Sequence, residues 1–333
     1  MKQFTLMLAA AAAVGWLFDL LHVPVGWLLG PMLVGVMAAG LNGGPRPLDQ
    51  RYQTFGQVVL GLAIGVGFPL QTLLTAATHA VPLLVAVVIT GGLSLLNGYL
   101  LWRWAGIDRA TGFLGSLPGA AHSMVAMSDD MGADAVTVAV LQYWRLLLVI
   151  FLSPVAVRFL FPPGAGVEVA TAAVAGPASA SVWVNVPVLL ACSALGLWGG
   201  TKAGLPSPTF LGPVLAALVA SWTLPWAFHV PAPLFNAALL LVGLSIGARF
   251  DVAMARKLGR AALIETVLVL ALIGISLLVG YGFHLVTGID AMTAVLGSTP
   301  GGMDVMVASA AQLGGNAGLV LAMQMTRWFI VLM

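Results

Sequence analysis

The sequence predicts an all-α integral membrane protein in which two copies of one helical unit lie in opposite orientations. Of its 333 residues, 60% are hydrophobic and only 7% are charged, whereas soluble domains carry about 25% charged residues. The apolar runs are continuous over about 18–25 residues, which fits spanning helices rather than the alternating strands of a barrel. The pattern also recurs at a constant offset in the second half, as in Gly30-Pro31 and Gly212-Pro213. We expect about five spanning helices and one re-entrant hairpin in each copy, and so about ten spans in total.

The repeat is carried by small and polar residues that recur without a gap over about 120 positions. Gly115-Ser116 and Pro118-Gly119 recur at 297–298 and 300–301. Gln142 and Arg145 recur as Gln324 and Arg327. We therefore predict membrane repeat 1 over residues 1–161, a linker over 162–181 and an inverted membrane repeat 2 over 182–333.

The continuous apolar runs place the elements in order. In the first copy we predict helices at 4–21, 24–41, 55–75, 80–102 and 134–160, and an interrupted segment at 109–128. In the second copy we predict helices at 183–201, 206–223, 234–250, 261–284 and 316–333, and an interrupted segment at 291–310. The first apolar stretch resembles a signal peptide, but Trp16 has a repeat partner in Trp198, so we expect it to be a helix of the protein body.

Basic residues predict that the two copies are inverted. In copy one they follow the second and fourth helices, as Arg46, Arg51, Arg103 and Arg109. In copy two they lie between the third and fourth helices, as Arg249, Arg256, Lys257 and Arg260. Because Lys and Arg stay on the cytoplasmic side, we expect a multi-pass protein of the bacterial inner membrane with a cytoplasmic N-terminus. Inversion requires an odd number of crossings, so each interrupted segment enters and leaves on one side; the alternative is a broken helix that crosses.

The interrupted segments are predicted to reach the middle of the membrane. From Arg109 to Pro118 is nine residues, or about 14 Å of helix, which is half of a hydrocarbon core of about 30 Å. Non-helical backbone at that depth is tolerated inside protein or beside a water-filled cavity, and such breaks build substrate sites in transporters. The predicted substrate-binding residues at the two tips are Ser116, Pro118, Gly119, Ser298, Thr299, Pro300, Gly301 and Gly302.

Two arginines are also predicted to lie near the midplane. Arg145 follows Asp134 by 11 residues and Arg327 follows Asn316 by 11, about 16 Å along a helix. A charge there costs between about 2.5 and about 17 kcal/mol and so needs a partner. That partner is either a buried acid, for example Asp304 or Asp129, or the carboxylate of an anionic substrate, which a guanidinium binds well. We predict substrate binding by Arg145 and Arg327, and by Gln142 and Gln324 one helical turn before them.

Asp304 and His122 occupy equivalent positions just past the two tips. We predict that they couple transport to H⁺ or Na⁺, the alternative being hydrogen-bonded polar residues. Glu265 lies in an apolar stretch, and we expect it to reach the membrane surface or to pair with Arg260.

Two pairs of glycines have the spacing of close helix contacts. They are Gly61 with Gly65 and Gly243 with Gly247. We interpret them as bundle packing; a dimer seam or a sliding surface is the alternative.

The segments "PGAAHSM…GADAVTVAVLQYWRLLLV" and "PGGMDVM…GGNAGLVLAMQMTRWFIV" resemble the AbrB family of bacterial membrane proteins. That family is duplicated and is unrelated to the DNA-binding transition-state regulator of the same name. The resemblance implies a transporter, although the family is also labelled ammonia-monooxygenase-like. Copy one departs from the motif, with Ala120 in place of the second glycine. The layout is also similar to that of 2-hydroxycarboxylate transporters, which implies a homodimer and an elevator movement.

We therefore expect a secondary active transporter of a small carboxylate-type anion, with no catalytic residues, cofactor or metal site. A net charge of +2 gives no reason to expect nucleic acid as a partner. The alternatives are a channel, a non-transporting membrane sensor or a monooxygenase component. A monooxygenase requires clustered His and carboxylate ligands, whereas the five histidines, at 22, 79, 122, 229 and 284, are scattered.

Overall fold

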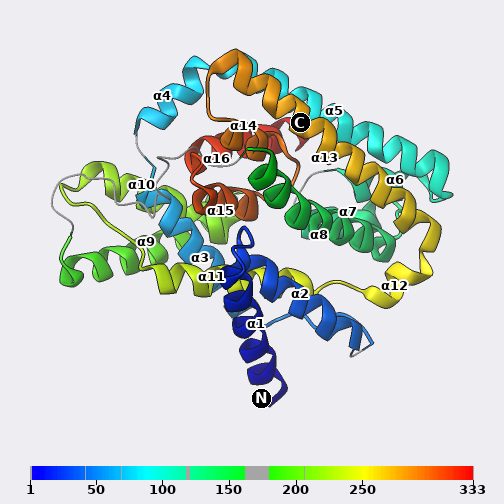
Figure 1. The fold of residues 1–333 in the computed structure, drawn as a ribbon, viewed down its shortest axis with the longest axis horizontal. Helices are drawn as coiled ribbons and strands as arrows, with labels where there is room; N and C mark the ends of the chain where they lie inside the picture. The colour runs from blue at the N-terminus through cyan, green and yellow to red at the C-terminus, as the bar shows by residue number, and fades with distance from the viewer. Residues whose placement is uncertain are drawn as a thin grey trace.

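The protein is helical in the part of the chain that the structure, a computed structural model, describes: residues 2–41, 43–68, 70–117, 121–161, 180–205 and 207–332. Sixteen helices, α1 to α16, run through these ranges (Figure 1). The prediction of an all-α protein is confirmed for these residues. The predicted linker lies outside the described residues over 162–179, as do Pro118 and Gly119 of the first tip.

The first half of the chain forms eight of these helices. They are α1 (Lys2–Leu20), α2 (Gly26–Leu41), α3 (Gln50–Val66), α4 (Leu70–Thr78), α5 (Ala80–Ala105), α6 (Arg109–Ser116), α7 (Ala121–Asp130) and α8 (Ala135–Leu160). The second half forms α9 (Val182–Lys202), α10 (Pro208–Thr223), α11 (Ala232–Ala248), α12 (Val252–Lys257), α13 (Gly259–Thr287), α14 (Ala291–Ser298), α15 (Met303–Leu313) and α16 (Ala317–Leu332).

Helix boundaries in the two halves are related by the same offset as the sequence repeat. Both ends of α2, α3 and α6 coincide with those of α10, α11 and α14 when the offset that relates Gly30 to Gly212 is applied. The caps match as well. Asp108 accepts a hydrogen bond from the Thr111 backbone nitrogen, and Asp290 accepts one from that of Thr293, both at 2.8 Å. Equivalent capping residues therefore start equivalent helices.

Two helices end before their predicted ends and are followed by short separate helices. The predicted helix at 55–75 ends at Val66, and α4 begins at Leu70. The predicted helix at 234–250 ends at Ala248, and Asp251 starts the separate helix α12 by accepting a hydrogen bond from the Met254 backbone nitrogen at 2.8 Å. Apolar residues continue from Val66 to Leu70, so hydropathy alone could not locate the first of these boundaries. The second lies at the charged residues Arg249 and Asp251.

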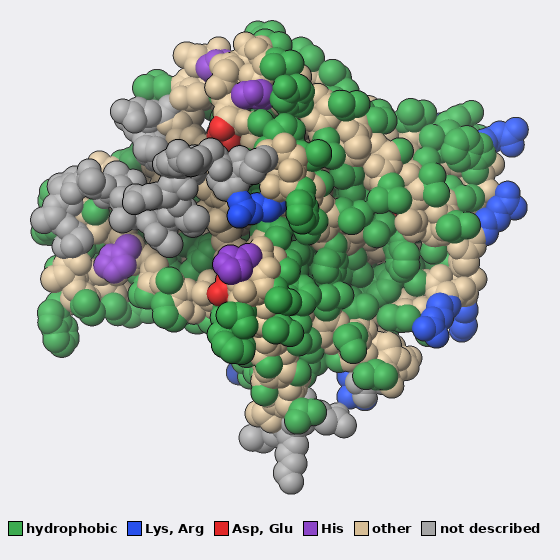
Figure 2. All heavy atoms as spheres, in the orientation of Figure 1, with side chains coloured by type: hydrophobic (Ala, Val, Ile, Leu, Met, Phe, Trp, Pro, Cys, Tyr) green, Lys and Arg blue, Asp and Glu red, His purple; other side chains and the backbone are tan. Residues whose placement is uncertain are grey.

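Four helices among the described residues are long and apolar enough to cross a membrane: α5, α8, α9 and α13. Shorter apolar helices lie at Phe4–Leu20, Gly26–Leu41, Pro208–Thr223, Ala232–Ala248 and Met303–Leu313. Figure 2 shows one face of the molecule covered mostly by hydrophobic side chains, with Lys and Arg along the edge where α5 ends and α13 begins. This composition is that of a membrane-embedded protein.

The helices pack into two groups, each of which draws on both halves of the chain. The first helix group comprises α1–α3 and α9–α11, with α2 against α11 and α3 against α10. The second helix group comprises α5–α8 and α13–α16. Within it α5 and α13 lie side by side and run in opposite directions (Figure 1). The short helices α4 and α12 connect the two groups in the chain.

Glycines make the close contacts of the first helix group. A Cβ atom added at Gly243 or Gly247 of α11 would collide with the carbonyl oxygen of Leu28 or Met32 of α2. In the equivalent contact, Gly61 and Gly65 of α3 face the carbonyl oxygens of Phe210 and Val214 of α10. The interpretation of these glycines as intrachain packing residues is confirmed.

This contact predicts that Gly247→Ala destabilises the protein. The added methyl group must push α11 away from α2, at a cost of about 1–3 kcal/mol. A lower unfolding temperature of the detergent-purified protein is the expected result. The control is Gly274→Ala in α13, where no atom of the described residues lies within 4 Å of the added Cβ; equal stability of the two variants would contradict the packing interpretation.

Candidate functional site

The broken end of helix α6 is held by two side chains of α8. Gln142 donates from Nε2 to the carbonyl oxygens of Leu114 at 2.5 Å and Leu117 at 3.0 Å. Arg145 donates to the carbonyl oxygen of Ser116 at 2.5 Å and to Oε1 of Gln142 at 2.7 Å. We call these contacts the first Gln–Arg clamp.

The second half of the chain builds the same arrangement at the equivalent positions of the repeat. Gln324 of α16 donates to the carbonyl oxygens of Leu296 at 3.1 Å and Thr299 at 3.0 Å. Arg327 donates to the carbonyl oxygen of Ser298 at 3.4 Å and to Oε1 of Gln324. This is the second Gln–Arg clamp, and each of these acceptors is the equivalent of one in the first.

The clamps explain how two arginines are accommodated in the interior of the protein. The last carbonyl groups of a helix have no partner within the helix and carry partial negative charge. A guanidinium and an amide satisfy them without an acidic side chain. The alternative that Arg145 pairs with Asp304 is wrong, because Asp304 instead accepts hydrogen bonds from Nε2 of Gln57 at 3.1 Å and from the Val305 nitrogen at 3.0 Å. The side chain of Asp129 lies outside the described residues.

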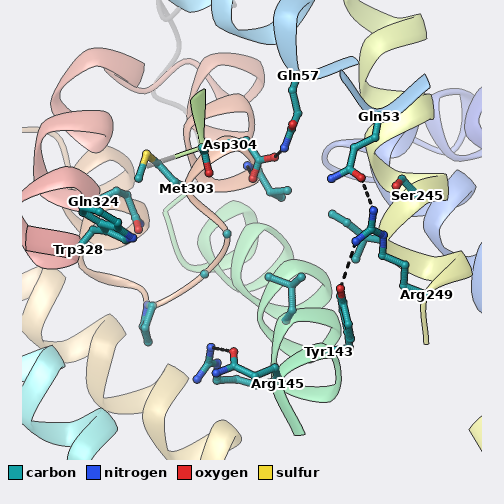
Figure 3. A pocket seen from close by; sticks show the side chains of 18 of the residues that line it. Gln53, Gln57, Tyr143, Arg145, Ser245, Arg249, Met303, Asp304, Gln324 and Trp328 are labelled. Carbon is teal, nitrogen blue, oxygen red and sulfur yellow. Dashed lines mark hydrogen bonds between the residues drawn. The ribbon is translucent and has the colours of Figure 1, made fainter. Parts of the chain in front are cut away.

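A cavity of about 150 Å³ lies where the two helix groups meet, beside the break between α14 and α15 (Figure 3). It is lined by Gln53, Gln57, Gln142, Tyr143, Arg145, Leu146, Ser207, Ser245, Ile246, Arg249, Pro300, Gly301, Gly302, Met303, Asp304, Val305, Gln324, Arg327 and Trp328. A cavity of this size holds a molecule about as large as benzene.

Eight of the predicted site residues line this cavity. They are Gln142, Arg145, Pro300, Gly301, Gly302, Asp304, Gln324 and Arg327. Three others are buried and bond within their own helix: the hydroxyl groups of Ser116, Ser298 and Thr299 donate to the carbonyl oxygens of Gly112, Ala294 and Val295. Pro118, Gly119 and the side chain of His122 lie outside the described residues. The second break therefore contributes residues on which the site can be built.

Sequence reasoning missed the polar wall that the first helix group contributes. Arg249, which we had used only as a loop charge, donates to Oη of Tyr143 at 3.4 Å and to Oε1 of Gln53. Gln57 accepts a hydrogen bond from Oγ1 of Thr209 at 2.5 Å while it donates to Asp304. The sequence did contain one signal, a departure from the repeat: the residue equivalent to Arg249 in the first copy is Gly67.

The cavity has the chemistry of an anion site. Among the described lining residues, three guanidinium groups, of Arg145, Arg249 and Arg327, accompany one carboxylate, that of Asp304. Ser245 adds a buried hydroxyl group that has no hydrogen-bond partner in the described part of the chain. Arginine groups inside a low-dielectric cavity attract carboxylates and bind them with paired hydrogen bonds. Among the described residues, no group of three or more His, Cys, Asp and Glu side chains is arranged to hold a metal ion.

The clamps predict that Gln324→Leu destabilises the protein. Leucine has a similar size but removes the donor to the Leu296 carbonyl oxygen and the acceptor of Arg327, at a cost of about 1–3 kcal/mol for each group left without a partner. Thermal unfolding of the detergent-purified variant is the measurement. As a control, Ser309→Ala removes a buried hydroxyl group that bonds to none of the described residues and should leave stability unchanged. Wild-type stability of the Gln324 variant would contradict the clamp.

Comparison with known proteins identifies the family. A family model described as "Transition state regulatory protein AbrB" matches residues 27–333. A protein of Escherichia coli (strain K12) named "Putative regulator AbrB" is 31% identical, over 95% of this chain and 89% of its own. "Uncharacterized protein YhjN" of Bacillus subtilis (strain 168) is 26% identical, over 98% of this chain and 89% of its own. The chain therefore belongs to the AbrB family.

Proposed function

We propose that the protein is a secondary active transporter of a small carboxylate-type anion, driven by H⁺ or Na⁺. The observation that carries this proposal is the cavity between the two helix groups, where Arg145, Arg249 and Arg327 meet the break between α14 and α15. Transporters commonly place their substrate where interrupted helices of two repeats face each other near mid-membrane. The size of the cavity fits a substrate of a few carbon atoms.

An inverted topology of about ten spans and two re-entrant hairpins follows from the proposal. It is supported by the antiparallel course of α5 and α13, which are equivalent in the repeat (Figure 1). The helices α6 and α7, and likewise α14 and α15, have 8–11 residues each, about half of a membrane span at 1.5 Å per residue. The remaining apolar helices then make five crossings in each half, with the N-terminus on the cytoplasmic side of the bacterial inner membrane.

Alternating access would come from movement of the second helix group against the first. Two side-chain contacts between described residues bridge the groups at the cavity: Gln57 to Asp304, and Arg249 to Tyr143. In both contacts the polar groups can exchange each other for a bound anion or a water molecule as hydrogen-bond partner, so the contacts can open when the groups move. In this elevator scheme the first helix group is the scaffold and forms the homodimer. Asp304, in the cavity wall, and His122 are the proposed coupling residues.

A membrane sensor is the second candidate, and the name of the E. coli relative, which contains the word "regulator", favours it. The same cavity would then bind an anion without moving it across the membrane. A channel would need an open path past both breaks. Flux measurements separate these functions, because a sensor gives binding without flux and a channel gives flux that no gradient can concentrate.

The transporter proposal predicts that Arg249→Gln impairs uptake into proteoliposomes. The test uses radiolabelled acetate, lactate, pyruvate and succinate, with proton or sodium gradients. Loss of a charge-assisted hydrogen bond costs about 1.5–3 kcal/mol, so the apparent affinity should fall about tenfold or more.

The matched control is Arg256→Gln. It removes the same charge from the exposed surface of α12 and should leave uptake unchanged. Absence of gradient-dependent flux for all four carboxylates in the wild type would contradict the transporter proposal. Equal impairment by the two substitutions would contradict binding at the cavity.

A further inference from the structure

Glu265 is a carboxylic acid inside α13 that the proposed function does not use. Its side chain is 0% exposed, and neither carboxyl oxygen has a hydrogen-bond partner among the described residues. The expectation that it reaches the surface or pairs with Arg260 is therefore wrong, and Arg260 is itself exposed. A buried carboxylate is retained only near a positive charge, or else it takes a proton.

The charge that acts on Glu265 is that of Arg145. Helix α8, which carries Arg145, packs against α13. The neighbouring residues join the two helices directly, because Nε1 of Trp144 donates to Oγ1 of Thr266 at 2.8 Å. Arg145 and Glu265 thus lie on adjoining faces of two packed helices, and no hydrogen bond joins these two described side chains.

The other charged and titratable groups near α13 lie at its ends or on the surface. Helix α14 has none. Tyr99 and Arg103 of α5, and Arg256 and Lys257 of α12, are exposed. Tyr143 of α8 bonds to Arg249, Arg158 lies in the last turn of α8, and Tyr281 and His284 lie toward the far end of α13. The electrostatic environment of Glu265 therefore depends on Arg145.

Arg145 also connects Glu265 to the cavity. Its side chain lines the cavity wall, whereas Glu265 does not. The carboxylate belongs to one copy only, since the equivalent of Glu265 is Leu83. Glu265 and Arg249 are thus both departures from the repeat, and both act on the same site.

We infer that Glu265, in place of the predicted coupling residues Asp304 and His122, binds the proton that is transported together with the anion, so that an anion entering beside Arg145 draws a proton onto Glu265. The inference rests on the proposed function. A second negative charge near Arg145 offsets the attraction between Arg145 and the Glu265 carboxylate, and a carboxyl group near a like charge takes up a proton. The proton comes from water, forms one O–H bond and returns to water when the anion leaves. One monovalent anion and one proton then cross together without net charge.

The test compares wild type with Glu265→Gln in proteoliposomes, using radiolabelled acetate, lactate, pyruvate and succinate. A proton gradient should drive accumulation in the wild type, and a membrane potential alone should not drive accumulation of the monovalent anions. Glu265→Gln should lose proton-driven accumulation at least tenfold while it retains exchange of labelled for unlabelled anion. Ser276→Ala, which removes from the same helix a buried hydroxyl group with no partner among the described residues, should behave as wild type. Proton-driven accumulation by Glu265→Gln would overturn the inference.

A second readout does not depend on transport. Infrared difference spectra between acidic and alkaline pH should show a carboxylic C=O band in wild type that is absent from Glu265→Gln. If wild type shows no such band, the inference is overturned, and this result does not require the variant to fold. Absence of exchange of all four anions by the wild type would instead contradict the transporter proposal, and the band alone would then decide whether Glu265 exchanges a proton.

Discussion

The hydrogen bonds from Gln142, Arg145, Gln324 and Arg327 to the broken ends of α6 and α14 are the interactions on which the rest of the structure depends. A helix that stops inside a membrane leaves carbonyl groups that neither water nor lipid can satisfy. The two clamps supply donors at that point, and the positive charge of each arginine faces the negative end of a helix. Without them the interruptions that shape the cavity would not be stable.

The same interactions position the chemistry of the site. Because each arginine holds a broken helix end, α8 and α16 must run beside the breaks, which brings both guanidinium groups to the cavity wall. Arg145 and Arg327 therefore combine a structural role with the proposed binding role. Arg249 has contacts outside the clamps, with Gln53 and Tyr143. Arg249, Asp304 and Glu265 depart from the repeat, and in our proposal these departures make one anion site from a scaffold of two equivalent halves.

Much of the fold could be predicted because a chain with so few charged residues is compatible with few folds. Composition and run length led to helices, and the repeat located both interruptions and the arginines behind them. The partners of Arg145 could not be predicted, because backbone carbonyl groups leave no mark in the sequence. Gln57 and Arg249 reach the cavity from α3 and from the end of α11. In the sequence both residues are far from the helix interruptions, so the repeat did not connect them with the site. The separate helix α4 was missed because the apolar pattern continues through its boundary, and α12 was missed because it lies in a charged segment that we interpreted as a loop.

A cryo-EM structure in lipid nanodiscs with lactate would test whether the cavity between the helix groups holds a small carboxylate. We expect density for one anion between Pro300–Gly302 and Arg249, within hydrogen-bonding distance of at least one guanidinium group. Density for lactate elsewhere, with water or side chains filling the cavity, would contradict this expectation.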